Sequence, residues 1–307
     1  MLLSKLKFVS LRLGFVSAKK VELPEMLGST LRGAFGKALK QAVCIMHHRE
    51  CQKCMLISSC HYFKIFESLK EEYKSKGLET PPHPYVIVPP IKHIYLENEV
   101  MYFDFTLFGD TNCLPYLIYA FQIMGKNGFG KNREKFELIS VKDKYTRKEA
   151  FVDGSLNMKH IIVRDLCEIS SVNLKSNSKL FISFYTPIRI LKDKKILKEI
   201  DLSTLKENLR RRYTNVMQLY GYFNEFDLSE LELLELEVLE TKYKRWNRYS
   251  NRQKKKIHQD GVYAKWILFP NSIKNYALLK AYSILHLGKS NTFGLGKFRM
   301  REIPILN

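Results

Sequence analysis

The stretch of sequence that decides the fold lies near the end of the chain, where residues 286–301 read HLGKSNTFGLGKFRMR. Three glycines, Gly288, Gly294 and Gly296, stand among cationic and hydroxyl side chains. Because glycine has no Cβ, the N–H groups of such a loop can approach a phosphate closely. A helix pattern precedes the loop and a strand pattern follows it, the reverse of the order in a mononucleotide P-loop. The loop is therefore interpreted either as a cradle for an RNA backbone or as a tight turn whose glycines serve packing.

A second corner of the same kind occurs in the first half of the chain, where residues 125–131 read GKNGFGK. Both corners contain glycine, lysine, asparagine, phenylalanine, glycine and lysine in that order, and a structural repeat explains the agreement. Each half reads strand, helix, strand, strand, helix, strand, which is the ferredoxin-like plan. We therefore expect an α+β fold with two tandem ferredoxin-like (RRM-like) domains, residues 1–172 and 173–307, joined near residues 173–178. The second domain would carry the C-terminal glycine-rich loop.

Hydrophobic periodicity predicts the elements of each half. In the first half, we expect strands at residues 6–15, 85–88, 100–108 and 136–141, and helices at residues 24–42, 63–73 and 114–124. In the second half, we expect strands at residues 179–191, 231–242 and 261–269, a helix at residues 205–223, and a final helix that leads into the glycine loop. The segment at residues 231–242 also suits a helix, and a cation-rich turn is expected between it and the next strand.

The charge of the chain points to a polyanionic partner. Of its 307 residues, 51 are Lys or Arg and 31 are Asp or Glu, which gives a net charge of +20 and a pI near 9.6. Nucleic acid is the first candidate and an anionic membrane is the second. No apolar run approaches the roughly 20 residues of a membrane-spanning helix, and Lys5 and Lys7 interrupt the N-terminus. We therefore expect a cytoplasmic protein with no signal peptide and no membrane contact.

Four cysteines form an insert at residues 44–60 of the first domain. Cys44, Cys51, Cys54 and Cys60 are separated by six, two and five residues. In a cytoplasmic chain such a cluster does not indicate disulfides, and four thiolates can close a tetrahedral metal site. Structural zinc is the expected metal, while an iron–sulfur cluster uses the same ligands and is not excluded by the spacing. Neighbouring histidines could replace a cysteine, and the remaining alternative is that the four cysteines bind nothing.

A second cluster consists of cations in the last third of the chain. Residues 242–256 contain eight cations and no acid, and Tyr243, Trp246 and Tyr249 are interleaved with them. Cations bind phosphates and aromatic faces stack on bases, so this run is interpreted as an RNA contact; the alternative is a solvated loop. The residues expected to bind RNA are Arg32, Arg245, Arg248, Arg252, Lys254, Lys255, Lys256, His258, Gly288, Gly294, Gly296, Lys297 and Arg299.

Taken in order, these segments resemble the CRISPR-associated endoribonucleases of the RAMP superfamily that process precursor CRISPR RNA, the sixth Cas protein family. The resemblance is carried by Leu23-Pro24, GSTLRGAFG at residues 28–36, the four-cysteine insert, the proline-rich residues 81–90, residues 107–109 and 124–130, FYTPIR at residues 184–189, RYSNRQ at residues 248–253 and the loop at residues 286–299. It implies two ferredoxin-like domains and metal-independent cleavage of repeat RNA. It also implies CRISPR repeat RNA or crRNA as a partner, together with other Cas proteins of an effector complex.

Cleavage of RNA without a metal cofactor requires a base for the 2′-OH, an acid for the leaving oxygen and a cation for the phosphorane. It gives 2′,3′-cyclic phosphate and 5′-OH ends. His47 and His48 follow the first helix, where the resemblance implies a catalytic histidine, and Lys37, Lys40 and Lys53 are candidates to stabilise charge. His286, beside Lys289 at the glycine loop, is the rival base. Alternatively, His47 and His48 cap the helix or support the metal insert, and His286 is a buried helix histidine.

The first helix departs from the family pattern, because it contains no tyrosine between Pro24 and Val43. This departure casts doubt on a site built from histidine, tyrosine and lysine. A second hypothesis is therefore a non-catalytic RNA-binding subunit of a RAMP-type effector complex. A third is a nucleic-acid-binding scaffold in which the cysteine insert docks a protein.

Overall fold

The structure is a computed structural model that describes residues 3–46, 50–67, 81–152, 154–170, 178–192, 195–228, 231, 234–250, 255–270 and 272–304. The chain divides into two compact units, one formed by residues 8–163 and the other by residues 1–7 and 164–307. We call them the first and the second unit, and describe each by itself. The joint expected at residues 173–178 lies almost wholly outside the described residues. No helix formed by the described residues is long and apolar enough to cross a membrane.

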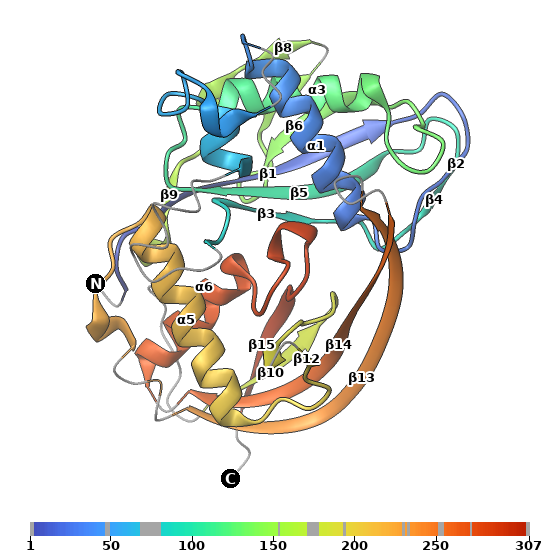
Figure 1. Cartoon of the computed structure of the whole chain (residues 1–307). Helices are drawn as coiled ribbons and strands as arrows, with labels where there is room; N and C mark the ends of the chain where they lie inside the picture. Colours follow the sequence, from blue (N-terminus) through green and yellow to red (C-terminus); the bar gives the residue numbers. More distant parts are fainter. Residues whose placement is uncertain are drawn as a thin grey trace. The chain divides into compact units, whose positions relative to one another are not determined.

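The first unit has a β-sheet whose strands follow the order β3-β5-β1-β6-β7-β8, and every pairing is antiparallel (Figure 1). The helices α1 and α3 precede β3 and β6 in the chain. The elements are β1 (Lys7–Val16), β2 (Val21–Glu22), α1 (Gly28–Val43), η1 (Cys51–Lys53), η2 (Phe63–Glu67), β3 (Tyr85–Val88), β4 (Ile94–Tyr95), β5 (Met101–Phe108), α3 (Leu114–Asn127), β6 (Glu137–Asp143), β7 (Glu149–Val152), β8 (Ser155–Leu156) and η3 (Met158–His160).

The core of the first unit follows from the period-two pattern of β1. Leu11, Leu13 and Phe15 are buried on one face of the strand, where they belong to the apolar cluster that includes α1 and α3. Phe35 of α1 stacks on Phe121 of α3 with 5.0 Å between ring centroids. Such aromatic contacts, added to the burial of apolar area, fix the two helices on the sheet.

The second unit repeats this topology. Its sheet has the strand order β13-β14-β10-β15, which corresponds strand by strand to β3-β5-β1-β6 of the first unit. The ferredoxin-like fold expected from the repeated corners is thus confirmed in both halves. The elements are β9 (Arg164–Asp165), α4 (Leu166–Ser170), β10 (Ser178–Phe184), β11 (Leu191–Lys192), β12 (Lys195–Ile196), α5 (Leu202–Tyr220), η4 (Glu225–Leu228), β13 (Leu234–Ser250), β14 (Lys255–Pro270), α6 (Ile273–Leu285), η6 (Asn291–Phe293) and β15 (Phe298–Pro304).

Side-chain caps determine where the helices of the second unit begin. Asp201 accepts a hydrogen bond from the backbone N–H of Thr204 at 2.7 Å, and Ser272 accepts one from Asn275 at 3.1 Å. These are N-cap interactions of α5 and α6, respectively. The hydroxyl of Tyr282 in α6 donates to a backbone carbonyl of α5, so the two helices are held together at buried positions.

The hairpin formed by β13 and β14 differs from the expectation. We expected strands only to residue 242 and from residue 261, with a cation-rich turn between them. Instead, the two strands continue to Ser250 and from Lys255, as a long curved hairpin (orange in Figure 1). The run of cations is therefore extended, because paired backbone hydrogen bonds outweigh the weak strand propensity of lysine and arginine. The helix predicted at residues 63–73 is described only as the π-helical turn Phe63–Glu67.

Candidate functional site

The basic hairpin has two chemically different faces, because side chains alternate along each strand. Arg245 lies opposite Asp260 and Asn247 opposite His258, and Lys256 follows at the next alternate position of β14, so these residues share one face, which we call the outer face. The inner face carries the residues between them. Its members are Lys244, Trp246, Arg248, Lys255, Ile257 and Gln259.

The outer face presents cationic and hydrogen-bonding side chains to solvent. Arg245, Asn247, Lys256 and His258 are all exposed. The acid of this face, Asp260, accepts a hydrogen bond from the hydroxyl of Tyr243 at 3.1 Å and forms an ion pair with Arg189 at 3.5 Å. The carboxylate of Asp260 is thus bound by two groups of the protein itself. The outer face can therefore contact a row of phosphates.

The inner face packs against the glycine loop. The guanidinium of Arg248 lies over the ring of Phe293, with 5.1 Å to its centroid, and the amide of Gln259 donates to the hydroxyl of Ser290 at 3.3 Å. One cation of the predicted basic cluster, Arg248, is thus used to fix the hairpin on the loop. Arg248, which the sequence grouped with Arg245, lies on the opposite face.

The glycines of the loop are required by close backbone approaches. Gly288, Gly294 and Gly296 have positive φ values of 78°, 83° and 73°. A Cβ on Gly296 would lie 1.7 Å from the carbonyl oxygen of Leu287, and one on Gly288 would lie 2.5 Å from that of Arg189. The amides of Gly294 and Gly296 donate to the carbonyls of Asn291 and Pro187 at 2.8 and 2.9 Å. In the described structure these two N–H groups bond within the protein, as the tight-turn interpretation expects.

His286 ends α6 and lies inside the second unit. It adopts a φ of 62°, its side chain is fully buried, and its Nδ1–H donates to the carbonyl of Leu295 at 3.2 Å. The side-chain amide of Asn291 donates to the carbonyls of Leu287 and Leu295 at 3.1 and 3.3 Å. These bonds satisfy loop carbonyls that would otherwise be buried without partners.

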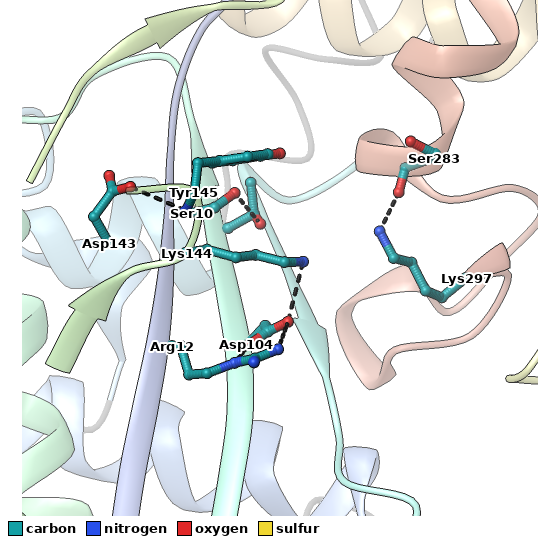
Figure 2. A network of polar contacts seen from close by, with 9 residues as sticks. Ser10, Arg12, Asp104, Asp143, Lys144, Tyr145, Ser283 and Lys297 are labelled. Carbon is teal, nitrogen blue, oxygen red and sulfur yellow. Dashed lines mark hydrogen bonds and ion pairs between the residues drawn. The ribbon is translucent and has the colours of Figure 1, made fainter. Parts of the chain in front are cut away.

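Two cations meet the C-terminal carbonyls of α6. Arg212 of α5 donates to the carbonyl of Leu285 at 2.8 Å, and the ammonium of Lys297 donates to that of Ser283 (Figure 2). Positive charge at a helix C-terminus is stabilising because it opposes the helix dipole. Burial lowers the pKa of Arg212 to about 10, so it stays charged at neutral pH.

The remaining cations of the loop have different surroundings. The guanidinium of Arg299 lies over the ring of Tyr185, with 5.1 Å to its centroid. The backbone N–H of Lys289 donates to the carbonyl of Arg189 at 2.7 Å. The loop thus combines side chains used for packing with cations that an RNA backbone could contact.

In the first unit, Arg32 of α1 lies in an aromatic environment. Its Nη2 donates to Nε2 of His83 at 3.1 Å, and its guanidinium lies 4.4 Å from the ring centroid of Phe66. Because arginine can only donate, His83 must accept at Nε2 and is neutral in this arrangement. Burial raises the pKa of Tyr85 to about 12, although the charge of Arg32 acts against this. Arg32 is thus an internal partner in the described structure, the alternative to its expected RNA contact.

The cysteine insert is only partly described. Cys44, Cys51, Cys54 and Cys60 are half-buried free thiols. Among the residues that the structure describes, no three cysteine, histidine or acidic side chains are grouped closely enough to hold a metal ion. The four-cysteine site therefore stays a prediction from the spacing. Burial raises the pKa of Cys51 despite the nearby Lys40.

Of the other catalytic candidates, the structure describes Lys53 but neither His47 nor His48. Lys53 is exposed and forms an ion pair with Glu50 at 2.6 Å. His47 and His48 lie outside the described residues, as do Arg252 and Lys254 of the basic run. Their roles stay predictions.

Two features of the first unit were not found from the sequence. One is the ion cluster in which Asp104 of β5 accepts from Arg12 of β1 at 2.8 Å and pairs with Lys144 at 3.0 Å (Figure 2). Burial alone would raise the pKa of Asp104, but Arg12 and Lys144 hold it below its ordinary value. Residues of β1, of β5 and of the turn after β6 meet in this cluster, so no local pattern marks it.

The other is a cavity of about 290 Å³ beside the C-terminal half of α1. Its lining comes from α1 and from the segment after the cysteine insert. The lining residues are Gly36, Lys37, Lys40, Gln41, Cys44, Tyr62 and Phe66. The helical spacing of residues 36, 37, 40, 41 and 44 could have indicated one face of α1, but nothing local pairs that face with Tyr62 and Phe66.

Comparison with known families gave two matches. A family described as CRISPR-associated endoribonuclease Cas6 matches residues 182–298, and the AF_1859_N N-terminal domain matches residues 6–161, half of the chain. No curated protein matched the chain.

Comparison with solved structures supports the same fold. A partial Cas6-RT-Cas1–Cas2 complex is 15% identical with a TM-score of 0.59, and the match covers 99% of this chain and 47% of that chain. A Cas6 product complex is 14% identical with a TM-score of 0.54, covering 96% and 99%. Thermus thermophilus Cas6 is 14% identical with a TM-score of 0.52, covering 97% and 100%. This chain thus spans less than half of the length of the first of these, and nearly all of the other two.

Proposed function

Because this chain belongs to the family of CRISPR-associated Cas6 endoribonucleases, we propose that it binds CRISPR repeat RNA and cleaves precursor crRNA at a fixed phosphodiester. The observation that carries the proposal is the Cas6 match over residues 182–298, the part of the chain that contains the basic hairpin and the glycine loop. The net charge of +20 supports a polyanionic substrate.

The proposed chemistry is metal-independent. The 2′-OH of one ribose attacks the adjacent phosphorus, the P–O5′ bond breaks, and the products end in a 2′,3′-cyclic phosphate and a 5′-OH. Histidine suits the transfer of both protons, because its ordinary pKa lies near neutral pH. We assign the base to His47 or His48, with Lys53 as the cation that stabilises the phosphorane. His286 and Lys289 form the alternative pair, although His286 is fully buried.

The outer face of the hairpin is proposed as the main RNA contact. Its exposed cations, Arg245 and Lys256, are held on paired strands, so their spacing is preorganised before RNA arrives. Lys255, on the inner face at the end of the hairpin, is exposed as well and adds positive charge there.

The partners are crRNA and other Cas proteins. Solved Cas6 structures of this fold include a substrate mimic complex and complexes with RT, Cas1 and Cas2. A second candidate function, a non-catalytic RNA-binding subunit, is favoured by one observation: α1 contains no tyrosine.

The test is a cleavage assay on repeat RNA in the presence of EDTA. Native RNA is compared with RNAs that carry a single 2′-deoxy nucleotide at each position in turn. One deoxy position should abolish cleavage, and the upstream product should end in a cyclic phosphate. If the RNA is bound tightly and stays intact, the endoribonuclease proposal fails and the non-catalytic RNA-binding subunit takes its place.

The base is then assigned with single variants. His47→Ala or His48→Ala should lower the cleavage rate at least about 100-fold, the usual contribution of general acid–base catalysis, with unchanged RNA affinity and thermal stability. His286→Ala should lower thermal stability, because it removes a buried hydrogen bond to Leu295. If His286→Ala lowers the cleavage rate without any loss of thermal stability, the general base is assigned to His286 at the glycine loop instead.

A further inference from the structure

Two cations on one face of α1 and two stacked aromatic rings beside it form a ladder, with one cation at each end. Arg32 lies over Phe66 at 4.4 Å, Phe66 stacks on Tyr62 with 5.6 Å between centroids and 20° between ring planes, and Lys40 lies 5.5 Å from the ring of Tyr62. Arg32 and Lys40 are eight residues apart on the same helix, so they reach the two ends of the stacked pair.

Glycine at position 36, between these two cations, lets the ring of Phe66 lie directly on the helix. A Cβ there would lie 2.1 Å from the ring. The hydroxyl of Tyr62 donates to Glu67 at 2.9 Å, which fixes the second ring. The ladder is therefore a rigid wall whose rings are held from both ends.

The cavity opens beside this wall. Tyr62 and Phe66 supply its aromatic part, Lys37 and Lys40 supply positive charge, and Gln41 supplies an amide that can donate and accept. Lys37 and Gln41 are exposed, whereas Tyr62 is buried, so the polar groups form the rim and the rings form the floor. None of the described residues that line the cavity is acidic.

These properties select the class of ligand. An apolar ligand would leave the lysines of the rim unused, and a free phosphate would leave the aromatic floor unused. A metal ion is not expected, because Cys44 is the only sulfur or carboxylate ligand among the lining residues. A nucleotide has a flat apolar base with a hydrogen-bonding edge and an attached phosphate, and a cavity of about 290 Å³ is of the size that holds one.

We infer that this cavity takes one unstacked base of the bound RNA, with the adjoining phosphate on Lys37 and Lys40. The inference rests on the proposed RNA-processing function and adds a specific subsite to it. The base would contact the aromatic floor, and Gln41 would bond its edge, which is how proteins read splayed-out bases of single-stranded RNA. Cys44 stands at the C-terminal end of this face of α1, three residues before His47. The residues of the proposed base subsite are therefore close in the sequence to the proposed catalytic segment.

The experiment is a double-mutant cycle on the full chain. Uncleavable repeat RNA, with a 2′-deoxy nucleotide at the cleavage site, is prepared with one abasic nucleotide at each position in turn. Its affinity for the native protein and for Lys37→Ala is measured by fluorescence anisotropy. Lys37 is exposed, so the variant should fold normally. Lys148→Ala, an exposed lysine on the turn between β6 and β7, is the matched control.

The native protein should lose about tenfold in affinity at one abasic position, because the lost base gives up its contact with the rings and its hydrogen bond to Gln41, and one such hydrogen bond contributes roughly 0.5–1.5 kcal/mol. Lys37→Ala should lose about fivefold on intact RNA, the value of one phosphate contact near 0.1 M salt. At the critical position the combined loss should stay near tenfold instead of fiftyfold, because base and phosphate are seated together. For Lys148→Ala, the loss of affinity should multiply with the loss at every abasic position, which means that the two changes are independent.

The outcomes separate this inference from the proposed function. If RNA is bound and native RNA is cut, but no abasic position couples to Lys37→Ala, the base subsite is wrong and the nuclease proposal stands. If one position couples while native RNA is never cut, the subsite stands and the nuclease proposal fails. Equal losses at all abasic positions would reduce Lys37 to a general phosphate contact and overturn the inference.

Discussion

The division of the basic hairpin into two faces predicts how its cations affect RNA binding. Replacing Arg245 and Lys256 together by alanine removes two exposed charges from the outer face. Arg248→Ala removes one charge from the inner face, where the guanidinium lies over Phe293. From the sequence alone these three residues belong to the same run of cations, so the variants test what the strand pairing adds.

The magnitude follows from counterion release. Each phosphate neutralised on a single strand contributes about 0.7 to the slope of log K against log salt concentration. Two lost contacts should therefore reduce the slope by about 1.4 and, near 0.1 M salt, weaken binding about 25-fold. Arg248→Ala should change the slope by less than about 0.3 on the same basis, because its charge is engaged within the protein.

The assay is fluorescence anisotropy of labelled repeat RNA at a series of salt concentrations. Thermal unfolding of each variant provides the control for folding, and Arg248→Ala should be the less stable protein because it loses a packed cation–π contact. If Arg248→Ala reduces the slope as much per charge as the outer-face variant does, the assignment of the two faces to RNA and to the loop is refuted.

Three further predictions concern stability and metal content. Asp104→Asn should cost about 2 kcal/mol at pH 7, since it removes the carboxylate that pairs with Arg12 and Lys144. Because the folded pKa of Asp104 is lowered, this difference in stability should shrink as the pH falls below about 4, and urea unfolding that shows no such convergence would contradict the prediction. Gly296→Ala should lower the free energy of unfolding by at least about 2 kcal/mol more than Gly154→Ala, because its new Cβ would lie 1.7 Å from a carbonyl oxygen. Gly154 is the matched control, since it also has a positive φ but no neighbour within 4 Å. Equal melting temperatures of the two variants would refute the packing role of the loop glycine. Metal analysis should find about one zinc per chain that Cys54→Ser loses and Cys167→Ser, in the core, retains; a metal-free native protein that takes up no zinc would exclude the site.

Much of the fold could be predicted from local pattern. The alternation at residues 6–15 and 100–108 and the helical spacing from Leu27 to Ala42 lie within or beside β1, β5 and α1 of the structure. The repeated glycine corners predicted the repeat of topology, which the two strand orders confirm. The length of the basic hairpin was not predictable, because its strand form depends on packing against Ser290 and Phe293, which belong to the glycine loop later in the chain.

The sequence by itself indicated a polyanionic partner and predicted the kind of fold, because charge is a sum over residues and periodicity is a local property. Tertiary structure alone decided which cations are available. It placed Arg245 in solvent and Arg248 on an aromatic ring, and it placed the ammonium of Lys297 where it donates to a carbonyl in the last turn of α6. It also brought Tyr62 and Phe66 onto the face of α1 that carries Lys40, a juxtaposition no local pattern contains. The physical reason is that a side chain's availability depends on what packs against it, and that is set by contacts between residues far apart in the chain.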